Sequence, residues 1–145
     1  MATFSKLLLA IDLSPLSESL LSRVKQLCGN EVDHMHVVHV LTTGMHDPSM
    51  FSDTRPDAHA QRRMDHTSLH LRSLLHGAGL LVPSERIYLK HGEPAHEIKR
   101  LATKLAADLV IVGSHAKEDD WMQLPGTTTN CVMQGIRSDV MAIRI

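Results

Sequence analysis

Small and hydroxyl-bearing residues form two runs in the last third of the chain, and their types suit the binding of an anion. The first run, Gly113-Ser114-His115-Ala116, directly follows the apolar residues Leu109 to Val112. The second run, Gly126-Thr127-Thr128-Thr129-Asn130, precedes an apolar helical turn. Glycine lets a backbone approach phosphates closely, and the N–H groups and hydroxyls of a helix start donate hydrogen bonds to them. The runs predict a phosphate site, with a tight connection that binds nothing as the alternative.

The elements around these runs follow from apolar patterning. Leu109 to Val112 contains three β-branched residues in four, which is typical of a strand buried on both faces inside a parallel sheet. Ser14 and Pro15 predict an N-cap and the first position of a helix. The apolar face of that helix is predicted at Leu16, Leu20, Val24 and Leu27. The other predicted strands are Leu7–Ile11, Val32–Leu41, Arg86–Leu89 and Val140–Ile145, and the other helices cover Asp57–Gly77 and begin at Gly92-Glu93-Pro94 and near Gly126.

Five strands that alternate with four helices predict a single α/β domain over residues 1–145. Its core is expected to be one doubly wound parallel five-stranded sheet with helices on both faces. In such sheets ligands bind beyond the carboxyl ends of the strands, where the strand order reverses. Asp12 and Gly113 follow the first and fourth strands, so they face one crevice if those strands are neighbours.

The composition excludes several classes of function. A formal charge of −1 and an aromatic content of 3% supply neither a basic field nor stacking platforms for a nucleic acid. No apolar run approaches the length of a membrane span, so we predict no membrane partner. Cys28 and Cys131 are far apart and form no metal-binding motif. We interpret them as reduced, buried thiols and predict a cytoplasmic protein.

No set of residues pairs a nucleophile with a general base, so we predict that the chain is not an enzyme. Ser114-His115 lacks both the glycine-flanked elbow of a hydrolase and an acidic partner. Asp12 lacks the neighbouring acid that a phospho-acceptor site needs. Two interpretations of Asp12 stay open, a carboxylate that contacts a ribose and a cap for the N–H groups of its own loop.

Eleven histidines raise the questions of metal binding and of acid sensitivity. His59, His66 and His70 form one stripe of a predicted helix, and His34 and His36 share one face of a predicted strand. Because no third ligand stands at a suitable spacing, we interpret both sets as solvated and predict no metal. Protonation of all eleven would raise the formal charge to about +10. Repulsion along the stripe in mild acid is one hypothesis, and titration without structural effect is the other.

The sequence resembles the universal stress protein family over nearly its whole length. The runs that carry the resemblance are Leu8–Ser14, His39-Val40, Gly92–Ala95 and, most characteristically, Ala107–His115. The resemblance implies the strand order 3-2-1-4-5. It also implies a homodimer made through the last strand, Val140 to Ile145.

Nucleotide-binding members of that family carry glycine, two residues, glycine, nine residues, then glycine with serine or threonine. Gly113, Gly126 and Thr127 match this motif, whereas Ala116 replaces its second glycine. The resemblance implies that the adenosine of ATP or AMP lies by Ala10, Ile11 and Asp12, with the Val40 backbone at the adenine. The full predicted binding set is Ala10, Ile11, Asp12, Val40, Val112, Gly113, Ala116, Gly126, Thr127 and Thr128.

Two functions therefore remain open from the sequence. The first is a stress-response module that binds an adenine nucleotide without fast turnover, and the second is a ligand-free dimeric interaction protein of the same fold. The acids Glu118, Asp119 and Asp120 lie within the phosphate loop. A carboxylate about 6 Å from a phosphate costs roughly 0.7 kcal/mol in water and about 2.8 kcal/mol at an effective dielectric of 20. We predict weak binding, with ATP at most about tenfold tighter than AMP unless these acids hold a bridging Mg²⁺.

Overall fold

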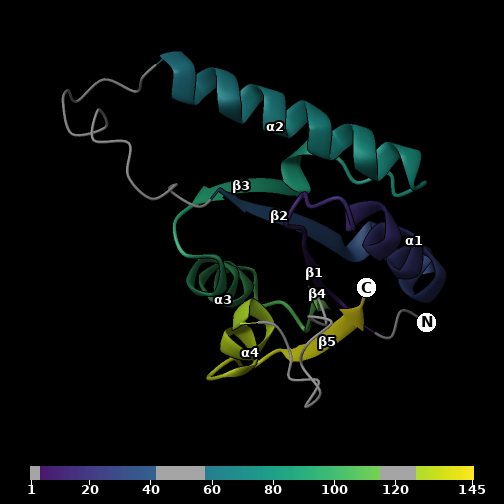
Figure 1. Ribbon diagram of the computed structural model, residues 1–145. Coiled ribbons are helices and arrows are strands. Elements are labelled where there is room, and N and C mark those ends of the chain that lie inside the picture. The colour runs from purple at the N-terminus through teal and green to yellow at the C-terminus, as the bar shows by residue number, and fades with distance from the viewer. Residues whose placement is uncertain (1–3, 42–57, 115–126) are drawn as a thin grey trace, which may run out of the picture.

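The protein is built on one sheet of five parallel strands in the order β3-β2-β1-β4-β5 (Figure 1). The computed structural model describes residues 4–41, 58–114 and 127–145, and within these ranges the side chains of all residues except 30–31, 58–60 and 127–129. The strands are β1 Leu7–Ala10, β2 Met35–Leu41, β3 Ile87–His91, β4 Leu109–Ser114 and β5 Asp139–Arg144. The predicted fold class and strand order are confirmed.

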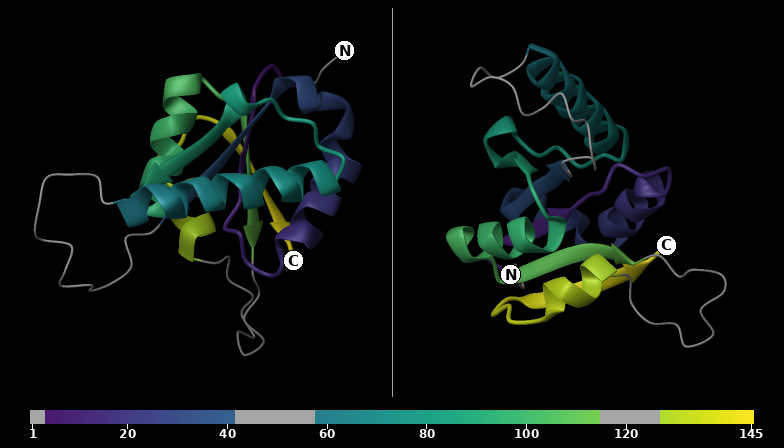
Figure 2. Two further views of the ribbon diagram at one scale, coloured as in Figure 1. Left: turned by 90° about the horizontal axis from the view of Figure 1, so that it is seen from above. Right: turned by 60° about the vertical axis from the view of Figure 1, so that its left-hand side comes forward.

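Helices cover both faces of the sheet. Helices α1 (Ser17–Cys28) and α2 (Ala58–Gly77) pack on one face, and α3 (Pro94–Leu105) and α4 (Thr127–Met133) pack on the other. The strand β5 lies at one edge of the sheet beside β4, as the yellow and green ribbons of Figure 2 show. The opposite edge is β3.

The central strands bury side chains on both faces. Leu109 and Ile111 of β4 join the core under α1 and α2, whereas Val110 and Val112 join the core under α3 and α4. This alternation is the period of two that a pleated strand imposes. All four side chains are at most 3% exposed, so the predicted burial of β4 on both faces is confirmed.

Asp108 fixes the start of β1 beside the start of β4. Its Oδ2 accepts hydrogen bonds from the backbone N–H of Ser5 at 2.6 Å and of Lys6 at 3.1 Å. The backbone N–H of Asp108 in turn donates to the carbonyl of Lys6 at 2.9 Å. These bonds align the two strands, so that Leu7 lies opposite Leu109 and Ala10 opposite Val112.

The helix α1 begins later than the sequence predicted. Its N-cap is Leu16, which makes no side-chain cap, and Ser14 closes the preceding turn by accepting the N–H of Ser17 at its carbonyl. Leu16 and Leu27 are 41% and 55% exposed, so their predicted place on the apolar face was wrong. Both fall just outside the buried stripe of this helix, which has 3.6 residues per turn. The stripe consists of Ser17, Leu20, Leu21, Val24 and Cys28.

The second strand is shorter than predicted because Gly29–His34 form a 3₁₀ helix. His34 therefore lies outside β2 and does not share a strand face with His36. Arg86, predicted to open the third strand, ends another 3₁₀ turn. Its guanidinium donates to the carbonyls of Val32 and Asp33, which connects the two turns.

The connection from β3 to α3 follows the sequence prediction. Gly92 has a φ of +138°, a conformation that favours glycine. The carboxylate of Glu93 accepts from the N–H of Ala95 at 3.2 Å and of His96 at 2.7 Å, which makes Glu93 the N-cap. Pro94 occupies the first turn, where its missing N–H costs nothing.

His36 of β2 makes folding sensitive to acid. Its ring stacks on Tyr88 with centroids 5.9 Å apart. Burial, followed by the charges of Arg86 and Lys6, lowers the pKa of His36 below its usual 6.5. The unfolded chain then binds the proton more readily than the folded one, so stability falls as the pH drops through about 6.5.

We expect His36→Phe to lose less stability than the wild type between about pH 7.5 and 5.5, because phenylalanine keeps the stacked ring and cannot titrate. Urea unfolding at both pH values measures the difference. His66→Phe, at an exposed position of the predicted stripe, is the control and should lose as much as the wild type. An equal loss in His36→Phe and the wild type would contradict the assignment.

Candidate functional site

The strand order reverses on either side of β1, which is the position at which the sequence predicts a ligand crevice. The strands β1 and β4 are parallel neighbours, and Ala10 of β1 lies opposite Val112 of β4. The chain leaves β1 toward α1 on one face, and β4 is followed by α4 on the other. Asp12 and Gly113 are therefore carried to adjacent carboxyl ends of the sheet, the position at which doubly wound folds bind ligands.

The turn between β1 and α1 is held by its own side chains. The Oδ1 atom of Asp12 accepts from the backbone N–H of Ser14 at 3.0 Å and from the hydroxyl of Ser17 at 3.3 Å. Leu13 between them adopts a left-handed backbone with φ of +56°. Of the two interpretations of Asp12, the structure displays the capping of the loop.

The side chains of the residues predicted to lie by the adenosine differ in their burial. The side chains of Ile11, Val40 and Val112 are buried in the two cores, so a ligand there would meet their backbone. Ala10 is half-buried and Asp12 is exposed.

Gly113 has a packing role that the sequence reasoning missed. A Cβ atom at this position would lie 3.1 Å from Cδ1 of Ile145 and 3.3 Å from Cδ2 of Leu20. The glycine therefore lets α1 and the chain end pack closely over β4. Close packing accounts for this glycine even without a phosphate.

The phosphate side of the predicted site is described only in part. Thr127 and Thr128 are the first residues of α4, in agreement with the helix that the sequence predicted to begin near Gly126. Ala116, Gly126 and the acids Glu118 to Asp120 lie outside the described residues, as do Thr42 to Pro56, for which the composition predicts a long mobile loop.

His39 is a second feature whose role the sequence reasoning did not identify. Its side chain is buried, on the same strand face as Val37, and its Nδ1 atom lies 2.7 Å from the carbonyl oxygen of Ile11. A histidine within an apolar strand of alternating pattern is the signal that could have drawn attention to it. The bond ties β2 to the residue that follows β1.

The described histidines and cysteines do not gather into a metal centre. Among residues 4–41, 58–114 and 127–145, no group of three or more His, Cys, Asp or Glu side chains could hold a metal ion. His66 and His70 of α2 are exposed, as expected for a solvated stripe. Cys28 is buried as predicted, whereas Cys131 is only half-buried, and neither of these two described cysteines forms a disulfide.

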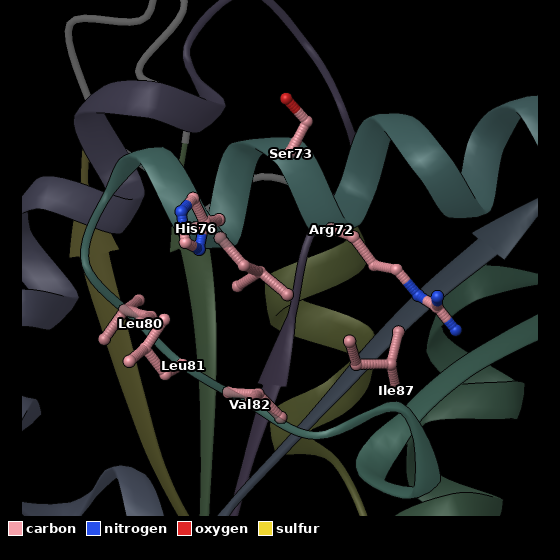
Figure 3. A pocket seen from close by; sticks show the side chains of 8 residues that line it. Arg72, Ser73, His76, Leu80, Leu81, Val82 and Ile87 are labelled. Carbon is pink, nitrogen blue, oxygen red and sulfur yellow. The ribbon is translucent and has the colours of Figure 1, made fainter.

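A separate cavity of about 390 Å³ lies under the last turns of α2 (Figure 3). Ile87 is the first residue of β3, so this cavity lies toward the amino ends of the strands. It is thus at the opposite end of the sheet from Asp12 and Gly113. Its lining residues are Arg72, Ser73, Leu75, His76, Leu80, Leu81, Val82 and Ile87.

Comparison with known proteins identifies the family. The sequence model described as "Universal stress protein family" matches residues 3–144. The chain is 28% identical over 144 residues to universal stress protein A homolog 1 of Coxiella burnetii, an alignment that covers 97% of this chain and 96% of the relative. Among the described residues, no helix has the length and apolar character that crossing a membrane requires.

Solved structures of other proteins share the fold, and two of them contain a nucleotide. A universal stress protein in complex with cAMP superposes with a TM-score of 0.64 at 16% identity, covering 99% of this chain and 98% of that one. The universal stress protein from Archaeoglobus fulgidus in complex with dAMP superposes with a TM-score of 0.60 at 14% identity, covering 98% and 99%.

A parallel sheet whose order reverses beside its first strand, with helices on both faces, defines the doubly wound class of α/β proteins. Within that class, the match across residues 3–144 shows that this chain belongs to the universal stress protein family. The resemblance inferred from the sequence is confirmed.

Proposed function

We propose that this chain is a regulatory module of the stress response that binds an adenine nucleotide, ATP or AMP, without fast turnover. The observation that carries the proposal is the parallel pairing of β1 and β4, which places Ala10 at the end of β1 beside Val112 near the carboxyl end of β4. The cAMP and dAMP complexes of the two structural neighbours support this class of ligand.

In this proposal the adenosine lies against Ala10, Ile11 and Asp12, and the adenine meets the backbone of Val40. The phosphates extend toward Gly113 and Ala116, and toward the helix start at Gly126, Thr127 and Thr128. Ala10 ends β1 and is half-buried, and Gly113 near the end of β4 has no side chain, and these small residues at neighbouring strand ends support this orientation.

The assembly and setting belong to the same proposal. We infer a single domain without catalytic activity, located in the cytoplasm, which forms a homodimer through the last strand, Val140 to Ile145. Neither a nucleic acid nor a membrane is a proposed partner. The position of β5 at an edge of the sheet supports the dimer, because an unpaired edge favours association.

Two contacts favour a second candidate, a ligand-free interaction protein of the same fold. Gly113 packs closely against Leu20 and Ile145, and Asp12 already caps its own loop. Both residues therefore have structural functions that would persist after nucleotide binding was lost.

Calorimetric titration with AMP, ATP and GMP decides between the two candidates. We expect weak binding of both adenine nucleotides, with ATP tighter than AMP by no more than about tenfold, or 1.4 kcal/mol. GMP controls for recognition of the base and should bind more weakly than AMP. Absence of binding by AMP and ATP, with and without Mg²⁺, would favour the ligand-free candidate.

A further inference from the structure

Two buried polar side chains from different elements bond to the same turn. Ser17 of α1 is 1% exposed and His39 of β2 is 8% exposed, and they are the buried polar residues of the described chain. Buried polar groups need hydrogen-bond partners, and both find theirs between β1 and α1. This is the turn that forms the adenosine side of the proposed site.

His39 holds the first residue of the turn. Its Nδ1 lies 2.7 Å from the carbonyl oxygen of Ile11. Because a carbonyl can only accept, Nδ1 carries the proton. The N–H of Ile11 donates to the carbonyl of Val38 at 2.9 Å. The backbone of Ile11 is thereby attached to β2 on both sides, one residue beyond the end of β1.

Ser17 holds the rest of the turn through Asp12. Its hydroxyl donates to Oδ1 of Asp12 at 3.3 Å, the atom that also accepts the N–H of Ser14. Leu13 has φ of +56°, a left-handed conformation that costs an L-residue about 1–2 kcal/mol. Such a conformation persists when the surrounding contacts determine it.

We propose that His39 and Ser17 are positioning residues, which hold Ile11 and Asp12 in the conformation that meets the adenosine. The inference rests on the proposed function, and it extends that function because neither side chain belongs to the proposed binding set. Loss of the His39 ring leaves a buried carbonyl of Ile11 without its donor, and the turn then rearranges to recover one.

Titration of variants with AMP at about pH 7.5 tests the inference. We expect His39→Leu to weaken AMP binding by about tenfold or more, and Ser17→Ala by about threefold. His39→Asn keeps an N–H donor near the position of Nδ1 and should restore affinity to within about threefold of the wild type. His36→Leu is the matched control, because it removes a ring from the other face of the same strand. Its affinity should stay within about twofold of the wild type.

The nitrogen spectrum of the wild-type histidines, measured by NMR, checks the bond directly. We expect His39 as the Nδ1–H tautomer, and an unprotonated Nδ1 would overturn the inference. Wild-type AMP affinity in His39→Leu would overturn the inference alone, whereas a wild type that binds no AMP would overturn the proposed function with it. If His39→Leu does not fold, the other two variants decide. The inference is overturned if Ser17→Ala binds AMP as tightly as the wild type and His39→Asn does not restore affinity.

Discussion

Replacing Ala142 with lysine is expected to convert a dimer of about twice 16.1 kDa into a monomer of 16.1 kDa at micromolar concentration. Among the described strands, β5 pairs with β4 alone, and Ala142 on it is exposed. In a two-fold dimer joined through β5, each protomer places one added lysine in the proposed interface. Association would then have to bury or displace two charged side chains where the proposed interface has two methyl groups.

Light scattering of the wild type and the variant measures this change. Leu81→Lys is the control, because Leu81 is 68% exposed and precedes β3 at the other edge of the sheet. It should leave the dimer intact. A wild type that is monomeric, or an Ala142→Lys variant that stays dimeric, would show that β5 does not form the interface.

Replacing Asp119 and Asp120 with asparagine is expected to raise ATP affinity by about tenfold more than AMP affinity. At about 6 Å, one carboxylate opposes each phosphate charge by roughly 0.7–2.8 kcal/mol, depending on the effective dielectric. ATP carries more of these charges than AMP, so relief of the repulsion favours ATP.

Calorimetry with and without Mg²⁺ separates two possible effects of these acids. Without the metal, the double variant should bind ATP more tightly than the wild type does. If the acids hold a bridging Mg²⁺, the wild type gains ATP affinity from the metal and the variant loses that gain. Tight ATP binding by the metal-free wild type, unchanged in the variant, would mean that the acids do not act on the phosphates.

The architecture could be predicted because its strongest signals are local. Four consecutive apolar residues from Leu109 to Val112 require burial on both faces of a sheet, and the structure buries all four. Gly92-Glu93-Pro94 likewise contains a glycine at positive φ, a side-chain cap and a first-turn proline. Each of these features acts over a few residues, so the pattern alone identifies it.

The features that could not be predicted depend on distant contacts. The Arg86 guanidinium donates to the carbonyl of Asp33, 53 residues away in sequence. No local sequence pattern predicts the 3₁₀ helix Gly29–His34 that contains Asp33. The packing at Gly113 depends on Ile145, and the role of His39 depends on a carbonyl 28 residues earlier. The sequence therefore indicated the location of the candidate site and missed the side chains that hold its turn.

The bond between Ser5 and Asp108 joins residues 103 positions apart, so it cannot form on the ribosome until Asp108 has been synthesised. The strands β1, β2 and β3 can pair as soon as His91 has emerged, because they are neighbours and precede β4 in the chain. One edge of β1 stays open until β4 is synthesised, and its leucines are exposed to other nascent chains meanwhile. The pairing of β1 with β4 thus forms late, so the proposed nucleotide can bind only after this interval has ended.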